Sequence, residues 1–157
     1  MSSFSRKIII FGAEYLIIVE GLVFLILVSQ KDTRTEASLF FFSGIVLILL
    51  SLLMAHILKL LFHKKRPPKK QEFFAPGDIY AFPSKHATIL TVLIFFIFQE
   101  SVSYGALVLC LGIVIVTCRV LAQVHRTQDI FFGILLGGVT AYIAMPYVLA
   151  FTGGMVS

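Results

Sequence analysis

The sequence predicts an all-α protein, an integral membrane bundle of about five transmembrane helices with an active site at one membrane face. Hydrophobic residues make up 59% of the 157 residues, charged residues make up only 13%, and the mean hydropathy is +0.99. Soluble domains carry far more charge than this. The length suits a single membrane domain, residues 1–157, with no second domain.

Five apolar runs divide the chain, and each is compared with the roughly 20 residues that one bilayer crossing requires. We expect spans at about residues 8–29, 38–62, 86–101, 105–122 and 128–150. The first contains Glu14 and Glu20, and the third is short. Arg6 and Lys7 precede the first run as in a signal peptide, but no small-residue cleavage site follows. We therefore interpret that run as a retained span.

One extended polar loop, residues 63–85, separates the second and third spans. It contains a basic run from His63 to Lys70 and several prolines, which argue against a continuous helix. Basic clusters beside a membrane usually contact lipid headgroups. That is the only role expected for four of its lysines: Lys64, Lys65, Lys69 and Lys70.

Successive spans cross the membrane in opposite directions, and this places the remaining polar residues at one membrane face. The end of the second span, the start of the third, the end of the fourth and the start of the fifth must share one membrane face. The polar residues at these ends are Lys59, Arg66, Ser84, Lys85, His86, Arg119, His125 and Asp129. Charged residues this close to lipid indicate a functional site.

His125 and Asp129 are four residues apart, so on a helix they would share one face. The carboxylate could then accept the imidazole N–H, which would leave the other ring nitrogen free as a nucleophile or base.

These residues resemble the three motifs of the type-2 phosphatidic acid phosphatase superfamily of integral-membrane lipid phosphate phosphatases. The first motif is matched by Lys59, six residues, then Arg66-Pro67. The second, usually Pro-Ser-Gly-His, is matched by Pro83-Ser84-Lys85-His86. The third is matched by Cys118-Arg119, five residues, His125, three residues, Asp129, where Ser usually precedes the Arg. The compact five-span plan and Phe82-Pro83-Ser84 are most similar to the bacitracin-resistance-type undecaprenyl pyrophosphate phosphatases of cell wall biogenesis.

The resemblance implies a hydrolase that converts undecaprenyl pyrophosphate to undecaprenyl phosphate. In this reading His125 attacks phosphorus and forms a phosphohistidine, and Asp129 orients it. His86 protonates the leaving oxygen and later activates water.

The same resemblance implies a set of phosphate-binding residues: Lys59, Arg66, Ser84 and Arg119. Cations suit this role because the charge of a phosphoryl group in transfer is spread over its equatorial oxygens. Lys85 stands where Gly is usual, and we expect it to reach the second phosphate of a pyrophosphate. Glu14 is a candidate for pairing with one of the cations and orienting it.

No metal or cofactor is expected, because no carboxylate cluster and no His/Cys spacing suits one. The expected partners are the lipid phosphate substrate and membrane lipids, with no nucleic acid. Two alternatives stay open. One is a phosphatase for phosphatidate or phosphatidylglycerophosphate. The other is a non-enzymatic bundle that binds anionic lipid, although such a bundle has no need of His86, His125 and Asp129 in register.

Two arguments conflict on the orientation of this multi-pass protein in the cell membrane. The opposite face holds only Lys31 and Arg34, and the other cations lie on the site face, so the positive-inside rule favours a cytoplasmic site. Even when the candidate phosphate ligands Lys59, Arg66, Lys85 and Arg119 are set aside, the site face still carries more cations than the opposite face. The resemblance favours an extracytoplasmic site, where wall synthesis releases undecaprenyl pyrophosphate, and we adopt that orientation.

Overall fold

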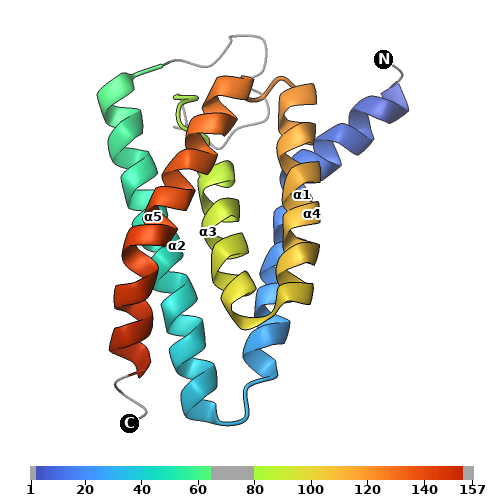
Figure 1. The fold of residues 1–157 in the computed structure, drawn as a ribbon. Helices are drawn as coiled ribbons and strands as arrows, with labels where there is room; N and C mark the ends of the chain where they lie inside the picture. Colours follow the sequence, from blue (N-terminus) through green and yellow to red (C-terminus); the bar gives the residue numbers. More distant parts are fainter. Residues whose placement is uncertain (1–2, 65–79, 154–157) are drawn as a thin grey trace.

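A computed structural model describes residues 3–64 and 80–153, except the side chains of residues 3–8, 10, 13, 14, 152 and 153. Five helices form a bundle (Figure 1), and their bounds are α1 Ser3–Ser29, α2 Arg34–Phe62, α3 Lys85–Glu100, α4 Val102–Leu121 and α5 Thr127–Gly153. Each predicted span corresponds to one helix, with ends that differ by a few residues. The all-α membrane bundle predicted from composition and apolar run length is confirmed.

The short helix α3 occupies the middle of the bundle. It packs against α2, α4 and α5, while α1 packs chiefly on α4 and α2 packs on α5. The end of α2, the start of α3, the end of α4 and the start of α5 all lie at one end of the bundle, the upper end in Figure 1. The gathering of these four helix ends, predicted from alternating crossings, is therefore present in the fold.

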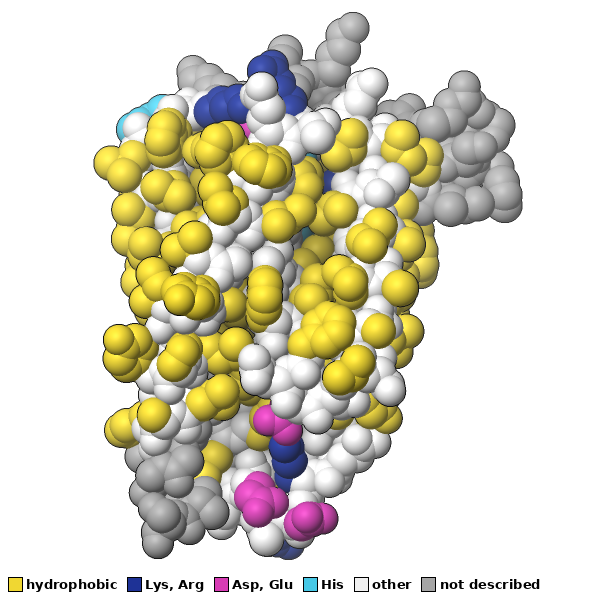
Figure 2. All heavy atoms as spheres, in the orientation of Figure 1, with side chains coloured by type: hydrophobic (Ala, Val, Ile, Leu, Met, Phe, Trp, Pro, Cys, Tyr) yellow, Lys and Arg dark blue, Asp and Glu magenta, His cyan; other side chains and the backbone are white. Residues whose placement is uncertain are grey.

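Three of the described helices, α2, α4 and α5, are long and apolar enough to cross a membrane. Figure 2 shows hydrophobic side chains over the middle of one face, with charged side chains at both ends. Helix α3 has 16 residues, about 24 Å, which is shorter than the roughly 30 Å hydrocarbon core of a bilayer. Because its neighbours bury most of it, α3 acts as the internal support of the bundle.

Local sequence signals explain several helix ends. Thr33 caps α2 by accepting a hydrogen bond from the backbone N–H of Glu36 at 3.1 Å. Ser101 caps α4 by accepting from the backbone N–H of Tyr104, and its own backbone N–H closes α3 on Ile97. One serine therefore ends one helix and starts the next.

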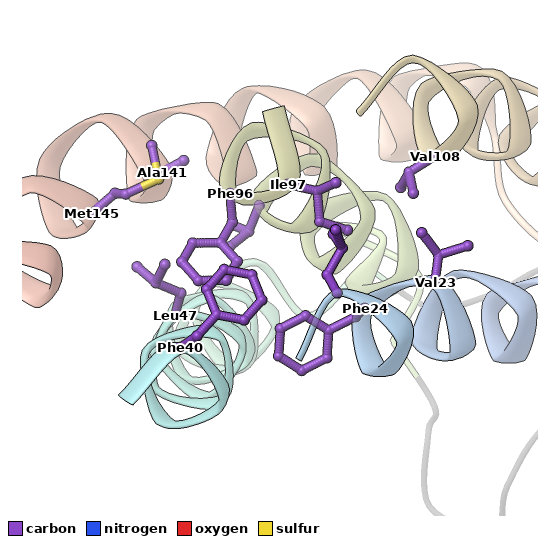
Figure 3. Packing of buried hydrophobic residues seen from close by; sticks show 11 residues of the cluster. Val23, Phe24, Phe40, Leu47, Phe96, Ile97, Val108, Ala141 and Met145 are labelled. Atoms are coloured by element: carbon purple, nitrogen blue, oxygen red, sulfur yellow. The ribbon is translucent and has the colours of Figure 1, made fainter. Parts of the chain in front are cut away.

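The hydrophobic core lies in the half of the bundle away from the gathered helix ends. Its centre is a group of aromatic rings from three helices, Phe24 of α1, Phe40 of α2 and Phe96 of α3 (Figure 3). The ring centroids of Phe40 and Phe96 are 4.7 Å apart, and those of Phe24 and Phe40 are 5.6 Å apart. These offset and tilted contacts join α1 and α2 to the central helix.

Glu20 is the exception to the apolar interior. Its side chain is fully buried, and neither carboxyl oxygen has a hydrogen-bond partner among the described residues. It lies against α4 at Gly112, where an added Cβ would stand 3.5 Å from Glu20 Oε1. The absence of a side chain at Gly112 therefore leaves room for the carboxyl group between α1 and α4.

Two glycines of α5 allow its close contact with α3. A Cβ added at Gly133 would lie 2.7 Å from the carbonyl oxygen of Ser84, and one at Gly137 would lie 2.5 Å from the carbonyl oxygen of Thr88. Both neighbours are backbone atoms and cannot move without displacing α3. Gly138 differs, because its added Cβ would meet only Phe95, at 3.9 Å.

We predict that Gly137→Ala destabilises the bundle, whereas Gly138→Ala does not. Alanine favours a helix over glycine by up to about 1 kcal/mol, but overpacking a close contact costs about 1–3 kcal/mol. The cost of overpacking should exceed the gain in helix propensity at Gly137 but not at Gly138. Thermal unfolding of both variants in the same detergent and at one heating rate measures this. Equal midpoints for the two variants would show that the close α3–α5 contact is not a constraint.

Candidate functional site

The turn between α4 and α5 places Arg119 and His125 together. Arg119 lies in the last turn of α4 and is buried, and the chain then reverses through Gln123, whose φ of 54° is left-handed. The carbonyl oxygen of Arg119 accepts hydrogen bonds from the backbone N–H groups of Val124, at 3.1 Å, and His125, at 3.5 Å. His125 is thus folded back onto the end of α4, where its side chain is only 4% exposed.

His125 does not share a helix with Asp129, and this part of the sequence prediction is wrong. Helix α5 begins at Thr127, so His125 lies in the connecting turn and Asp129 in the first helical turn. The Asp129 carboxylate also caps the start of α5, because its Oδ2 accepts a hydrogen bond from the backbone N–H of Arg126 at 3.0 Å. The preference of the short polar residues for helix starts outweighs the i, i+4 spacing here.

Ser84 joins the start of α3 to the start of α5. Its backbone N–H donates to the carbonyl oxygen of Asp129 at 3.0 Å, and its Oγ caps α3 by accepting from the backbone N–H of Ala87. Lys85 and His86 form the first turn of α3 and are half-buried. The positive end of the α3 dipole therefore lies at the same end of the bundle as Arg119 and His125, as an anion site requires.

Lys59 brings the end of α2 to the same place. The side chain is buried although it is charged, and its Nζ donates to the carbonyl oxygen of Tyr80 at 2.9 Å. The backbone N–H of Ala81 donates to the carbonyl oxygen of Lys64 at 2.8 Å. These two bonds attach the end of α2 to the segment that leads into Ser84.

Two predicted site residues fall outside this description. Arg66 lies in residues 65–79, outside the described residues, and the same is true of the side chain of Glu14. Their expected roles stay predictions. The remaining predicted residues all lie at the gathered helix ends: Lys59, Ser84, Lys85, His86, Arg119, His125 and Asp129.

Lys64 is a site residue that the sequence analysis missed. It was expected to contact only lipid headgroups, but its Nζ lies 2.7 Å from Oδ1 of Asp129. The carboxylate side chain is 1% exposed and the lysine side chain 31%. The ammonium also lies 5.4 Å from the ring centroid of Phe82. Nothing in the sequence separates Lys64 from the lysines beside it, because its partner is 65 residues away.

The arrangement suits a phosphoryl group. Cationic side chains from α2 and α4 lie at the same end of the bundle as the positive end of α3 and a buried histidine, so negative charge developing on phosphoryl oxygens there would be stabilised. The described residues contain no group of three or more His, Cys, Asp or Glu side chains that could hold a metal ion. The chemical means present are therefore positioned cations, hydroxyl and backbone donors, and two histidines.

Comparison with known proteins identifies the family. A model of the PAP2 superfamily matches residues 40–152, which covers most of the chain and includes all the gathered helix ends. The chain belongs to the PAP2 superfamily. Membership indicates a phosphatase that acts on lipid phosphates. No curated protein and no solved structure matches the chain.

We predict that Lys64→Met lowers kcat at least tenfold, whereas Lys64→Arg retains most activity. Without the ammonium, the buried Asp129 carboxylate loses a charged partner beside the turn that carries His125, and the turn should lose its fixed position.

Lys31→Met is the matched control, because Lys31 forms an ion pair with Glu100 at the opposite end of the bundle, where the carboxylate is 29% exposed and not buried like that of Asp129. Exposed pairs contribute little, so its kcat should stay unchanged. Steady-state phosphate release by the purified variants measures this. Similar kcat values for Lys64→Met and Lys31→Met would mean that the Lys64 pair has no part in the reaction.

Proposed function

We propose that this protein removes the terminal phosphate from a lipid pyrophosphate and that its substrate is undecaprenyl pyrophosphate, which it converts to undecaprenyl phosphate. The observation that carries the proposal is the burial of Lys59, Arg119 and His125 at gathered helix ends of an apolar bundle. Cations gathered at one end of an apolar bundle attract anionic groups, and a lipid phosphate brings such a group to the membrane surface.

In the first half of the proposed reaction a ring nitrogen of His125 attacks the terminal phosphorus. A nitrogen–phosphorus bond forms as the bond from phosphorus to the bridging oxygen breaks. Lys59, Arg66 and Arg119 stabilise the charge on the equatorial oxygens, with Ser84 and backbone N–H groups as neutral donors. His86 donates a proton to the leaving oxygen, so the lipid monophosphate departs.

In the second half, water replaces the lipid. His86, now neutral, accepts a proton from a water molecule as the water oxygen attacks phosphorus. The nitrogen–phosphorus bond breaks, inorganic phosphate leaves and His125 is restored. Asp129 holds the position of His125, and Lys64 in turn holds the carboxylate. Lys85, in the first turn of α3, is assigned to the inner phosphate that a pyrophosphate has and a monoester lacks.

The proposal places the site at the extracytoplasmic face of the cell membrane, where wall synthesis releases the substrate. Lys59, Arg66, Lys85 and Arg119 are assigned to the phosphate in this proposal, so part of the excess of cations on the site face has a cause other than topology. The opposite end, where Lys31 pairs with Glu100, carries both signs of charge.

We predict that His125→Ala abolishes phosphate release from undecaprenyl pyrophosphate, because His125 is the group assigned to form the covalent intermediate. The assay compares this lipid with phosphatidate and phosphatidylglycerophosphate, in detergent and with EDTA present. His56→Ala, which removes an exposed histidine of α2, is the control and should keep wild-type activity. A tenth of wild-type activity in His125→Ala would exclude His125 as the nucleophile. Loss of wild-type activity in EDTA would exclude a metal-independent mechanism.

His86→Ala should impair phosphatidate hydrolysis more than undecaprenyl pyrophosphate hydrolysis. A lipid monophosphate leaves more readily than an alkoxide, so general acid catalysis, typically worth about 10²–10⁴-fold, matters less for the pyrophosphate. The ratio of kcat values on the two substrates, variant against wild type, measures the difference. Equal losses on both would contradict the assignment of His86 as the acid.

A further inference from the structure

An apolar groove of about 440 Å³ lies among α3, α4 and α5. Helices α4 and α5, which this turn joins, both pack on α3, and in Figure 1 α3 lies behind the gap between them. The floor of the groove runs along α3 from Ala87 to Phe98, and its walls include Leu109 and Ile113 of α4 and Ile134 of α5. Its lining is almost entirely apolar.

One end of the groove lies next to the candidate active site. Ala87, at its upper end, follows His86 in the chain and is the residue whose backbone N–H Ser84 caps. Ile113 and Ile134 line it while being 56% and 44% exposed, so it is open on the side that faces the bilayer. A molecule can therefore enter from the hydrocarbon region while its polar end stays at the gathered helix ends.

We infer that this groove holds the first segment of a single hydrocarbon chain of the lipid phosphate substrate. The inference rests on the proposed function and adds to it a site for the chain. A phosphate held by Lys59 and Arg119 would have its chain directed along α3, since α4 and α5 leave this gap beneath the turn. An apolar, lipid-facing wall provides no hydrogen-bond partners to compensate the desolvation of a polar ligand.

The dimensions limit how much of the chain is held. Ala87 and Phe98 are eleven residues apart, which corresponds to about 16 Å along the helix. The volume is about three times the roughly 150 Å³ of an engineered apolar cavity that binds one benzene molecule, so the groove holds on the order of three isoprene units. At the far end Phe98 packs on Gly105, where an added Cβ would lie 2.5 Å from Phe98 Cγ. The rest of a longer chain then continues into the bilayer.

Two neighbouring residues of α4 give a matched test. Ile113 lines the groove, whereas Val114 does not and is 47% exposed elsewhere on the helix. Both side chains are already largely exposed, so a tryptophan at either position leaves the core intact. Ile134 and Leu135 of α5 form a second pair of the same kind, 44% and 51% exposed.

The experiment measures kcat/KM for dimethylallyl, farnesyl and undecaprenyl pyrophosphate. Ile113→Trp should lower kcat/KM about tenfold for farnesyl and undecaprenyl pyrophosphate and leave dimethylallyl pyrophosphate, whose chain is one isoprene unit, unchanged. Val114→Trp should change none of them. Ile134→Trp and Leu135→Trp should repeat the contrast. Equal constants within each pair would overturn the inference, and so would an equal loss on all three substrates, which would mean that the tryptophan disturbs the phosphate site.

A binding measurement separates this inference from the proposed function. If the wild-type protein releases phosphate from none of the three compounds, the proposed function fails, but the groove can still be tested with a farnesyl pyrophosphate analogue that carries a diazirine at the chain end. Crosslinks to the peptides that contain Phe98 or Leu109 would support the site. Crosslinks confined to α1 or α2 would overturn it.

Discussion

The hydrogen bond from the backbone N–H of Ser84 to the carbonyl oxygen of Asp129 joins two helices whose starts lie 42 positions apart in the chain, at Lys85 and Thr127. It holds the first turn of α3, with His86, beside the first turn of α5 and the preceding turn, with His125. The bond can form only where the two backbones approach closely, and Gly133 is the residue that permits it. The position of both candidate catalytic histidines therefore depends on a backbone hydrogen bond and on the absence of a side chain at Gly133.

Much of this arrangement could be predicted from the sequence. Apolar runs of bilayer length define the helices, because a helix is the structure that satisfies its backbone within the hydrocarbon region. Because successive helices run in opposite directions, four helix ends then lie together. The spacings from Lys59 to Arg66 and from Arg119 to His125 resemble those of the family motifs. Gly133 and Gly137 are close-packing positions between α5 and α3, whereas Gly138 has no such contact.

The contacts that could not be predicted are those between residues far apart in the sequence. The Lys64–Asp129 ion pair joins α5 to the residue that follows the capping position of α2, and a basic run gives no sign of which lysine will make it. The place of His125 before α5 was missed for a different reason. Its spacing from Asp129 fits a helix, but Asp129 is a helix-capping residue and sets the helix start after His125. The groove depends on how α4 and α5 diverge, which no single residue determines.

The burial of Glu20 against Gly112 has a consequence for biosynthesis. Helix α1 is made first, but the helix that encloses Glu20 is the fourth, so the nascent chain must carry this carboxyl group through the synthesis of α2 and α3. An acidic residue at the centre of an isolated helix costs about 2.5–3.5 kcal/mol on insertion scales. Docking of α4 encloses the carboxyl group but gives neither of its oxygens a hydrogen-bond partner among the described residues. The main packing partner of the first helix is therefore synthesised only after α2 and α3, so α1 cannot complete its packing until most of the chain has been made.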